Sequence, residues 1–168
     1  NNVSEKEQVL EIAKKDIIAF GQLFMPEDFM KSTPAPYHYE LSDLLLDDTK
    51  KRNCIILPRG HSKSTLAKAA LMYHLYFNPE GKKEFIAWVA EEQSQAIDHI
   101  KYIQNHIEMN PALNYYFGDL QGSKWTEKEF TTSKGDRIIA KGELDLEQVK
   151  KLLIKSGGLL SSEMGYKD

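Results

Sequence analysis

The stretch of residues 54–65 constrains the fold of this chain more than any other part of the sequence. Its first four residues are apolar and are typical of a short buried strand. Pro58 and Gly60 end that strand, because proline fixes φ and glycine permits a positive φ. Ser62 then opens a predicted helix that runs to about Asn78. A strand, a tight loop, Lys-Ser-Thr and a helix in this order predict a phosphate-binding loop.

In such a loop, backbone N–H groups at the helix start face the phosphates, and the helix dipole favours their negative charge. Lys63 would reach the β- and γ-phosphates, and the Ser64 hydroxyl would hold Mg²⁺. The expected cofactors are therefore ATP and Mg²⁺. The predicted binding residues are Pro58, Arg59, Gly60, His61, Ser62, Lys63, Ser64 and Thr65.

The match to the standard pattern G-x-x-x-x-G-K-[ST] is incomplete, because Leu57 and Ser62 occupy the places of its glycines. Gly60 and the small Ser62 would still allow a compact loop. The alternative interpretation is a strand–turn–helix junction with a solvated Lys63. The order of strand, loop, Lys-Ser-Thr and amphipathic helix favours nucleotide binding.

The segment Arg59-Gly60-His61-Ser62-Lys63-Ser64 resembles the deviant Walker A motif of phage terminase large subunits, the ATPases that package DNA into viral heads. In that family an arginine commonly stands four residues before the lysine, as Arg59 does here. The resemblance extends over about residues 15–142. It implies a motor ATPase in which Lys63 and Arg59 are catalytic and neutralise charge that develops on the γ-phosphate.

The same resemblance implies the partners and the cellular location. The partners would be double-stranded DNA, a portal protein, a small terminase subunit and like subunits in a homo-oligomeric ring on the portal. The location would be the cytoplasm of the host cell. Composition adds little to this, because the net charge of −3 provides no overall basic field for nucleic acid.

Length and composition are those of an ordinary soluble domain. The chain has 168 residues, of which 41% are hydrophobic and 28% charged, so one domain with a sizeable core is expected. The single cysteine, Cys54, excludes a disulfide within the chain and fits a reducing compartment. No run is apolar enough for a membrane span, and no signal peptide is visible, so no membrane association is expected.

Two helices are predicted before the loop. Ser4 and Glu7 form a capping box, and the following helix carries apolar residues at helical spacing up to Phe24, where Pro26 ends or interrupts it. A second helix is predicted from about Tyr37 to Leu46. Its apolar end followed by Asp47 and Asp48 imitates a Walker B strand, but the helical spacing and the position before the loop argue against one; the apolar residues concerned are Leu41, Leu44 and Leu45.

Tyr37 and His38 begin this second helix, in the place where terminases and helicases contact adenine upstream of the phosphate loop. An aromatic ring can stack on a purine, and a polar side chain can bond its edge. The alternative is that both residues simply pack the loop, since aromatic and histidine residues are common at such junctions. Both interpretations remain open.

The second half of the chain predicts another strand–helix unit and a hairpin. Residues 84–90 read as a buried strand, and a helix follows over about residues 92–109. Strands at 125–130 and 137–140, joined by a turn at 133–136, form the hairpin, whose Lys134 and Lys141 are open to phosphate contact or to solvation. The expected fold is α/β and P-loop NTPase-like, with a mainly parallel sheet flanked by helices and a β-hairpin near the C-terminal part.

The resemblance to terminases stops after Gly142. A terminase would continue into a buried strand ending in Asp-Glu, whereas this chain predicts an amphipathic helix with apolar residues Leu146, Val149, Leu152 and Leu153. The predicted organisation is an N-terminal helical segment (1–30), a P-loop ATPase core (31–142) and a helical tail (143–168). Two other functions stay open: a non-catalytic nucleotide-binding or assembly module, and a helicase-like P-loop translocase.

Overall fold

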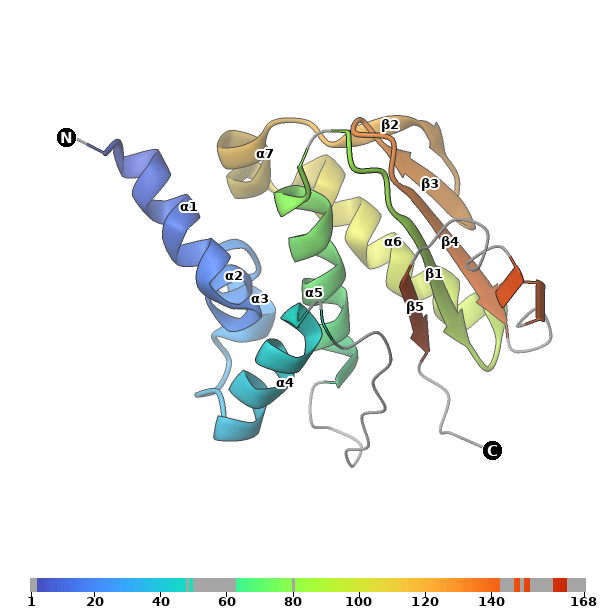
Figure 1. The fold of residues 1–168 in the computed structure, drawn as a ribbon, viewed down its shortest axis with the longest axis horizontal. Coiled ribbons are helices and arrows are strands. Elements are labelled where there is room, and N and C mark those ends of the chain that lie inside the picture. Colours follow the sequence, from blue (N-terminus) through green and yellow to red (C-terminus); the bar gives the residue numbers. More distant parts are fainter. Residues whose placement is uncertain are drawn as a thin grey trace. The chain divides into compact units, whose positions relative to one another are not determined.

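The computed structural model describes residues 3–47, 49, 63–79, 81–142, 147–148 and 150–151, together with the backbone of 159–162. The chain divides into two compact units, Asn1–Phe77 and Asn78–Asp168. The described part of the first unit is helical, and the second combines a sheet with helices (Figure 1). The predicted α/β class is therefore confirmed. In the described ranges no helix combines the length and the apolar character needed to cross a membrane.

The helical unit begins with the predicted capping box. The Ser4 N–H donates to Glu7 Oε2 at 2.9 Å, and the Glu7 N–H donates to Ser4 Oγ at 3.2 Å. The two reciprocal bonds satisfy backbone donors that the first helical turn leaves without acceptors. The described helices of this unit are α1 (Glu5–Lys15), α2 (Ile17–Phe24), α3 (Pro26–Phe29), α4 (Pro36–Leu46) and α5 (Lys63–Phe77).

One helix up to Phe24 was predicted, but the structure breaks it at Asp16. This residue is extended, with φ −159°, and its carboxylate accepts from the Ala19 N–H at 2.6 Å. Aspartate is a weak helix former and a strong N-cap residue, so it ends α1 and starts α2. The apolar spacing continues across the break, which is why periodicity alone does not reveal it.

Aromatic packing joins α2 to the end of α5. The Phe20 ring centroid lies 5.1 Å from that of Phe24, 5.8 Å from Tyr73 and 6.0 Å from Phe77. Phe20 and Phe24 are fully buried. The Tyr73 hydroxyl also donates to the Lys14 carbonyl oxygen at 2.6 Å, which ties the last turn of α1 to α5.

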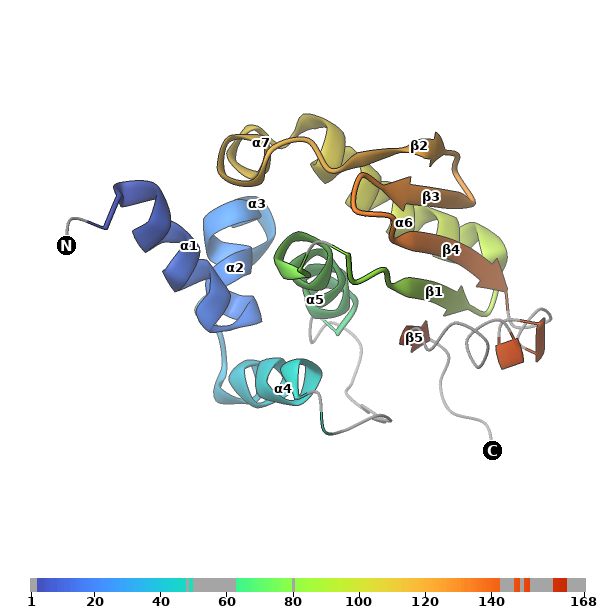
Figure 2. The same ribbon diagram turned by 45° about the horizontal axis from the view of Figure 1, so that its top comes forward.

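The second unit contains the sheet. Its strands are β1 (Phe85–Ala90), β2 (Gln121–Trp125), β3 (Glu129–Thr132), β4 (Arg137–Gly142) and β5 (Leu159–Ser162). They lie in the order β2-β3-β4-β1-β5 (Figure 2). β1 is parallel to β4 and β5, whereas β3 is antiparallel to β2 and β4. The sheet is therefore mixed, whereas the sequence predicted a mainly parallel sheet.

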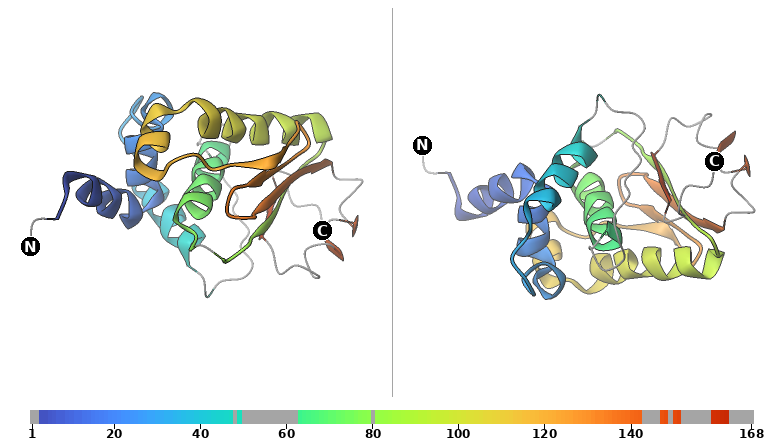
Figure 3. Two further views of the ribbon diagram at one scale, coloured as in Figure 1. Left: turned by 90° about the horizontal axis from the view of Figure 1, so that it is seen from above. Right: turned by 90° about the horizontal axis from the view of Figure 1, so that it is seen from below.

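Helix α6 (Gln93–Met109) covers one face of the sheet over β1 and β4 (Figure 3). Its buried residues recur at helical spacing, namely Ala96, Ile100, Ile103 and Ile107. Trp88 of β1 stacks on His99 of α6, with ring centroids 5.0 Å apart. The predicted strand over 84–90 and helix over 92–109 are confirmed to within a residue at each end. Helix α7 (Pro111–Phe117) follows directly.

The predicted hairpin is present, with different strand limits. β3 and β4 pair across the turn at 133–136, but Trp125 ends a separate strand, β2, which pairs with β3. Asp136 in the turn is fully buried. Its carboxylate accepts from the Glu84 N–H at 2.9 Å and from the Thr132 hydroxyl at 2.8 Å, so it links the turn to the start of β1.

The helix predicted for the tail is observed at the four residues that the structure describes within it. Residues 147, 148, 150 and 151 are helical. The apolar residues predicted for this helix, Leu146, Val149, Leu152 and Leu153, lie outside the described residues. β5, which was not predicted, adds a parallel strand beside β1.

Candidate functional site

The structure describes part of the predicted nucleotide site. Tyr37 and His38 lie in the first turn of α4, and Lys63, Ser64 and Thr65 form the first turn of α5. Both helices belong to the helical unit and contact each other. The remaining predicted residues are outside the described ranges: Pro58, Arg59, Gly60, His61 and Ser62.

The described part of α5 starts with the Lys-Ser-Thr segment that was predicted to follow the phosphate-binding loop. The helix begins at Lys63, whose side chain is exposed, while Ser64 and Thr65 are half-buried. The first N–H groups of an α-helix have no acceptor within it, and the dipole makes this end positive. The lysine and the hydroxyl groups therefore lie in the first described turn of α5, on the N-terminal side of the helix.

The position of this helix start is fixed by packing along the rest of α5. Leu66 follows the Lys-Ser-Thr segment directly and is 2% exposed, and further buried residues extend to Tyr76. At the other end, Tyr73 is held by the aromatic cluster and by its bond to α1. Burial raises the pKa of Tyr73, and the nearby charge of Asp16 raises it further. The Tyr73 hydroxyl is therefore protonated at neutral pH and remains a donor.

The two ring nitrogens of His38 have different surroundings: Nδ1 accepts a hydrogen bond, and Nε2 is buried. The Ala35 N–H donates to His38 Nδ1 at 2.9 Å, and the Tyr37 and His38 rings lie 4.2 Å apart between centroids. Because Nδ1 accepts in the neutral ring, the proton belongs on Nε2. That nitrogen is buried and has no hydrogen-bond partner in the part of the chain that the structure describes. His38 therefore caps its own helix through Nδ1 and keeps Nε2 buried.

Ser42 fixes α4 in place one turn after His38. It is fully buried, and its hydroxyl oxygen accepts from the Ile17 N–H at 2.9 Å. This N–H belongs to the first residue of α2 and has no acceptor within α2. His38 and Ser42 lie on the same face of α4, so the bond also sets the position of His38 relative to α2.

In the sheet unit, a polar segment joins the end of β1 to the start of α6. Glu91 and Glu92 are exposed there, and α6 begins at Gln93. Gln93 Nε2 donates to the Ala140 carbonyl oxygen at 3.1 Å. A Cβ atom on Gly142 would lie only 3.2 Å from the Gln93 nitrogen, so the end of β4 and the start of α6 are closely packed.

Two segments of the chain place acidic residues after an apolar run or a strand. Leu44 to Leu46 belong to α4, which confirms that they do not form a Walker B strand. Asp47 accepts from the Thr49 N–H at 2.9 Å, and Asp48 lies outside the described residues. β5 was missed, because four residues after a Gly-Gly pair carry little strand signal. Glu163 follows β5 directly in the sequence and lies outside the described residues.

Within the described ranges, no group of three or more His, Cys, Asp or Glu side chains is placed to hold a metal ion. The predicted binding of Mg²⁺ by Ser64 stays an expectation, because this ion would enter together with the nucleotide. Searches with protein-family models and against curated proteins found no match to this chain.

Proposed function

We propose that this chain binds ATP and Mg²⁺ at the start of α5 and is the ATPase domain of a terminase-type DNA-packaging motor, with a P-loop fold. The observation that carries the proposal is that the described part of α5 starts with Lys63-Ser64-Thr65, which directly follow residues Pro58 to Ser62 in the sequence. The residue types suit the charge of a triphosphate, since an exposed lysine and two hydroxyl side chains follow one another in the first described turn of α5.

In this proposal each residue has a defined role. Lys63 and Arg59 neutralise the phosphate charge, and Ser64 holds the Mg²⁺, which stabilises charge on the phosphates when bound. Tyr37 would supply a flat face for the adenine ring, and His38, the second residue predicted to contact the base, lies beside it. The partners are double-stranded DNA, a portal protein, a small terminase subunit and further copies in a ring, in the host cytoplasm.

Hydrolysis also requires a carboxylate that orients the attacking water. Glu143 and Glu147 follow β4 in the sequence, and Glu163 follows β5, which is parallel to β1. The carboxyl ends of parallel strands meet at one edge of a sheet, where such groups commonly act. These three glutamates are therefore the first to replace by glutamine if the chain hydrolyses ATP.

Titration calorimetry with ATP and Mg²⁺ tests the proposal, with phosphate release followed in parallel. Lys63→Ala should weaken ATP binding roughly 10-fold or more, because hydrogen bonds to charged groups contribute about 1.5–3 kcal/mol. Lys14→Ala removes another exposed lysine of the same unit and should leave the affinity unchanged. Wild-type affinity in Lys63→Ala, or no ATP binding by the wild type, contradicts the proposal.

Phosphate release separates the catalytic motor from the non-catalytic nucleotide-binding module. Release that is lost in Lys63→Ala supports the motor ATPase. Binding that needs Lys63 but gives no release supports the module, a reading that the departure from the terminase pattern after Gly142 favours.

A further inference from the structure

The first turn of α4 is fastened to the preceding loop by the His38 side chain. The Ala35 N–H donates to His38 Nδ1 at 2.9 Å, and the His38 N–H donates to the Ala35 carbonyl oxygen at 3.0 Å. The first of these bonds is the His38 cap. Pro34 and Pro36 have no N–H, so Ala35 supplies the one backbone donor of residues 34–36. The His38 cap uses this donor to hold the loop against the helix.

The His38 cap requires a neutral imidazole ring. A ring that accepts at Nδ1 carries its proton on Nε2, and its Nδ1 lone pair is the acceptor. Protonation would place a second N–H on Nδ1, where it would face the Ala35 N–H. Two donors cannot bond each other, so the cap would be lost. The amide oxygen of a glutamine at this position would accept at either pH, whereas the acceptor of a histidine disappears in acid.

The second ring nitrogen also disfavours a protonated ring. His38 Nε2 is buried and has no hydrogen-bond partner among the residues that the structure describes. The nearest carboxylates of α4 belong to Glu40 and Asp43, which are exposed and stand two and five residues from His38. Side chains three or four residues apart are neighbours on a helix, so neither carboxylate lies beside the ring.

The helices packed against α4 supply little negative charge. These helices are α2 and α5. The charged or titratable groups on them, including the N-cap of α2, are Asp16, Lys63, Lys68, Tyr73, His74 and Tyr76. Asp16 is the one carboxylate in this set, and it accepts from the Ala19 N–H. A positive charge on His38 would therefore lose the cap and find no carboxylate of these elements in exchange.

We propose that His38 is a pH-sensitive cap, which holds the start of α4 closed when the ring is neutral and releases it when the ring is protonated. The released segment is the first turn of α4 with the loop before it, whose residues 31–33 are exposed. Tyr37 belongs to this turn, and its ring centroid lies 4.2 Å from that of His38. An effect of this release on ATP binding, through Tyr37, rests on the proposed function.

The direction of the pH effect follows from where the proton binds. The opened turn exposes the ring and takes up a proton, whereas the closed turn needs Nδ1 as an acceptor. The closed turn is therefore favoured at alkaline pH and is lost as the pH falls. Because histidine in water titrates at about pH 6.5, a change from about pH 8 to about pH 5.5 should favour the opened turn roughly 10-fold.

Amide hydrogen exchange of the full chain, followed by NMR without nucleotide, tests this inference. The protection of the Ala35 amide, relative to its intrinsic exchange rate at each pH, should fall roughly 10-fold between about pH 8 and about pH 5.5. His38→Gln should keep this protection at both pH values, because a glutamine three residues after the N-cap accepts from the N-cap N–H and does not titrate. His74→Gln removes a histidine of α5 and should behave like the wild type. Circular dichroism confirms that each variant is folded.

The inference is overturned if the Ala35 protection of the wild type is equal at both pH values, or if His38→Gln loses it in acid as the wild type does. Loss of the pH dependence in His74→Gln also contradicts it, because another histidine would then control the turn. The exchange measurement needs no nucleotide, so its result is independent of the phosphate loop. A chain with pH-dependent Ala35 protection that binds no ATP would remove the proposed function alone, and ATP binding with pH-independent protection would remove this inference alone.

Discussion

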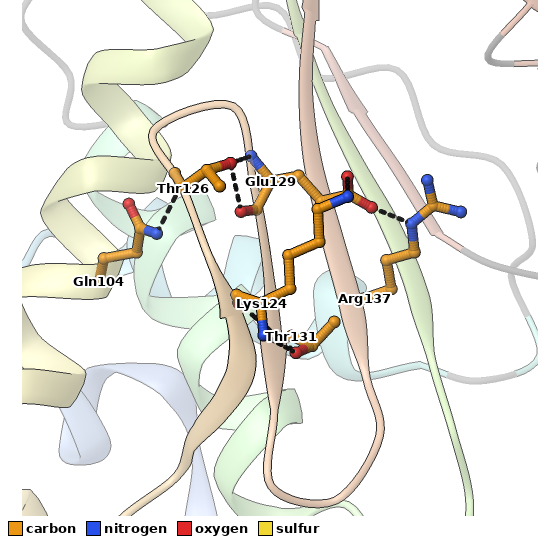
Figure 4. A network of polar contacts seen from close by, with 6 residues as sticks. All are labelled: Gln104, Lys124, Thr126, Glu129, Thr131 and Arg137. Atoms are coloured by element: carbon orange, nitrogen blue, oxygen red, sulfur yellow. Dashed lines mark hydrogen bonds and ion pairs between the residues drawn. The ribbon is translucent and has the colours of Figure 1, made fainter.

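Burial and ion pairing shift the pKa of the Glu129 carboxyl group in opposite directions. Burial raises its pKa, but the hydrogen bonds from Lys124 and Arg137 (Figure 4) and the positive charges of both residues outweigh this effect. The net result is a pKa below the ordinary value for glutamate. The carboxylate is therefore ionised at neutral pH, and the charges of Glu129, Lys124 and Arg137 are all present.

This lowered pKa predicts a pH-dependent contribution to stability. The stabilisation is fully present above the ordinary glutamate pKa of about 4.3 and is lost as the pH falls through the lower folded-state value. We expect a loss of about 1 kcal/mol or less, because the paired cations are largely exposed. Urea unfolding of the wild type and Glu129→Gln, measured from neutral to acid pH, checks this. The difference in unfolding free energy should shrink towards acid pH, and a constant difference would contradict the interpretation.

The role of His38 shows how far residue identity alone can be interpreted. The sequence placed Tyr37 and His38 correctly at a helix start but left two interpretations open. The structure shows that His38 Nδ1 bonds the Ala35 N–H, which is a structural role. The pattern could not reveal this bond, because a histidine three residues after an ordinary alanine is not a usual capping signal. The burial of His38 Nε2 depends on tertiary packing, which a local sequence pattern does not contain.

At the scale of single elements, the break between α1 and α2 depends on a distant side chain. Asp16 ends one helix locally, but the first N–H of α2 is satisfied by Ser42, 25 residues further on. A buried N–H without an acceptor is unfavourable. The helix break at Asp16 therefore needs the Ser42 hydroxyl as an acceptor for the Ile17 N–H. Periodicity predicts the buried face across the break and cannot detect a partner so far away in the chain.

Ser42→Ala should therefore destabilise the helical unit. The substitution leaves the buried Ile17 N–H without its acceptor, at an expected cost of about 1–3 kcal/mol. Thermal unfolding followed by circular dichroism measures the stability, and hydrogen exchange of the Ile17 amide reports on the bond itself. Ser94→Ala, at an exposed site near the start of α6, is the matched control and should change neither measurement. Unchanged protection of the Ile17 amide would show that Ser42 does not hold α2.

The sheet shows which strands a sequence pattern can predict. β1 is a run of buried residues with strong strand signal, and it was predicted to within a residue. β2 has the sequence Gln-Gly-Ser-Lys-Trp, which has neither apolar alternation nor an apolar run, and β5 is a short Leu-Leu-Ser-Ser segment. Both missed strands form the edges of the sheet. Pairing with a formed neighbour stabilises such edges, and that contribution is absent from local sequence.

At the scale of the whole molecule, length suggested one domain, yet the chain forms two compact units. The aromatic cluster around Phe20 forms the centre of the helical unit, and α6 with β1 and β4 forms the centre of the other. Both tryptophans of the chain, Trp88 and Trp125, belong to the sheet unit. Tryptophan fluorescence therefore reports on the sheet unit, whereas far-ultraviolet circular dichroism reports on helices of both.

This distribution predicts that the two signals will not coincide during urea unfolding, because two units with separate centres need not unfold together. Asp136→Ala provides the decisive comparison. It leaves the Glu84 N–H and the Thr132 hydroxyl without their buried acceptor, at an expected cost of about 2 kcal/mol or more. The fluorescence transition should move to lower urea, while the part of the dichroism signal from the helical unit stays in place. Asp98→Ala, on the exposed side of α6, should move neither. Coincident transitions that shift together in Asp136→Ala would mean that the chain unfolds as one cooperative unit.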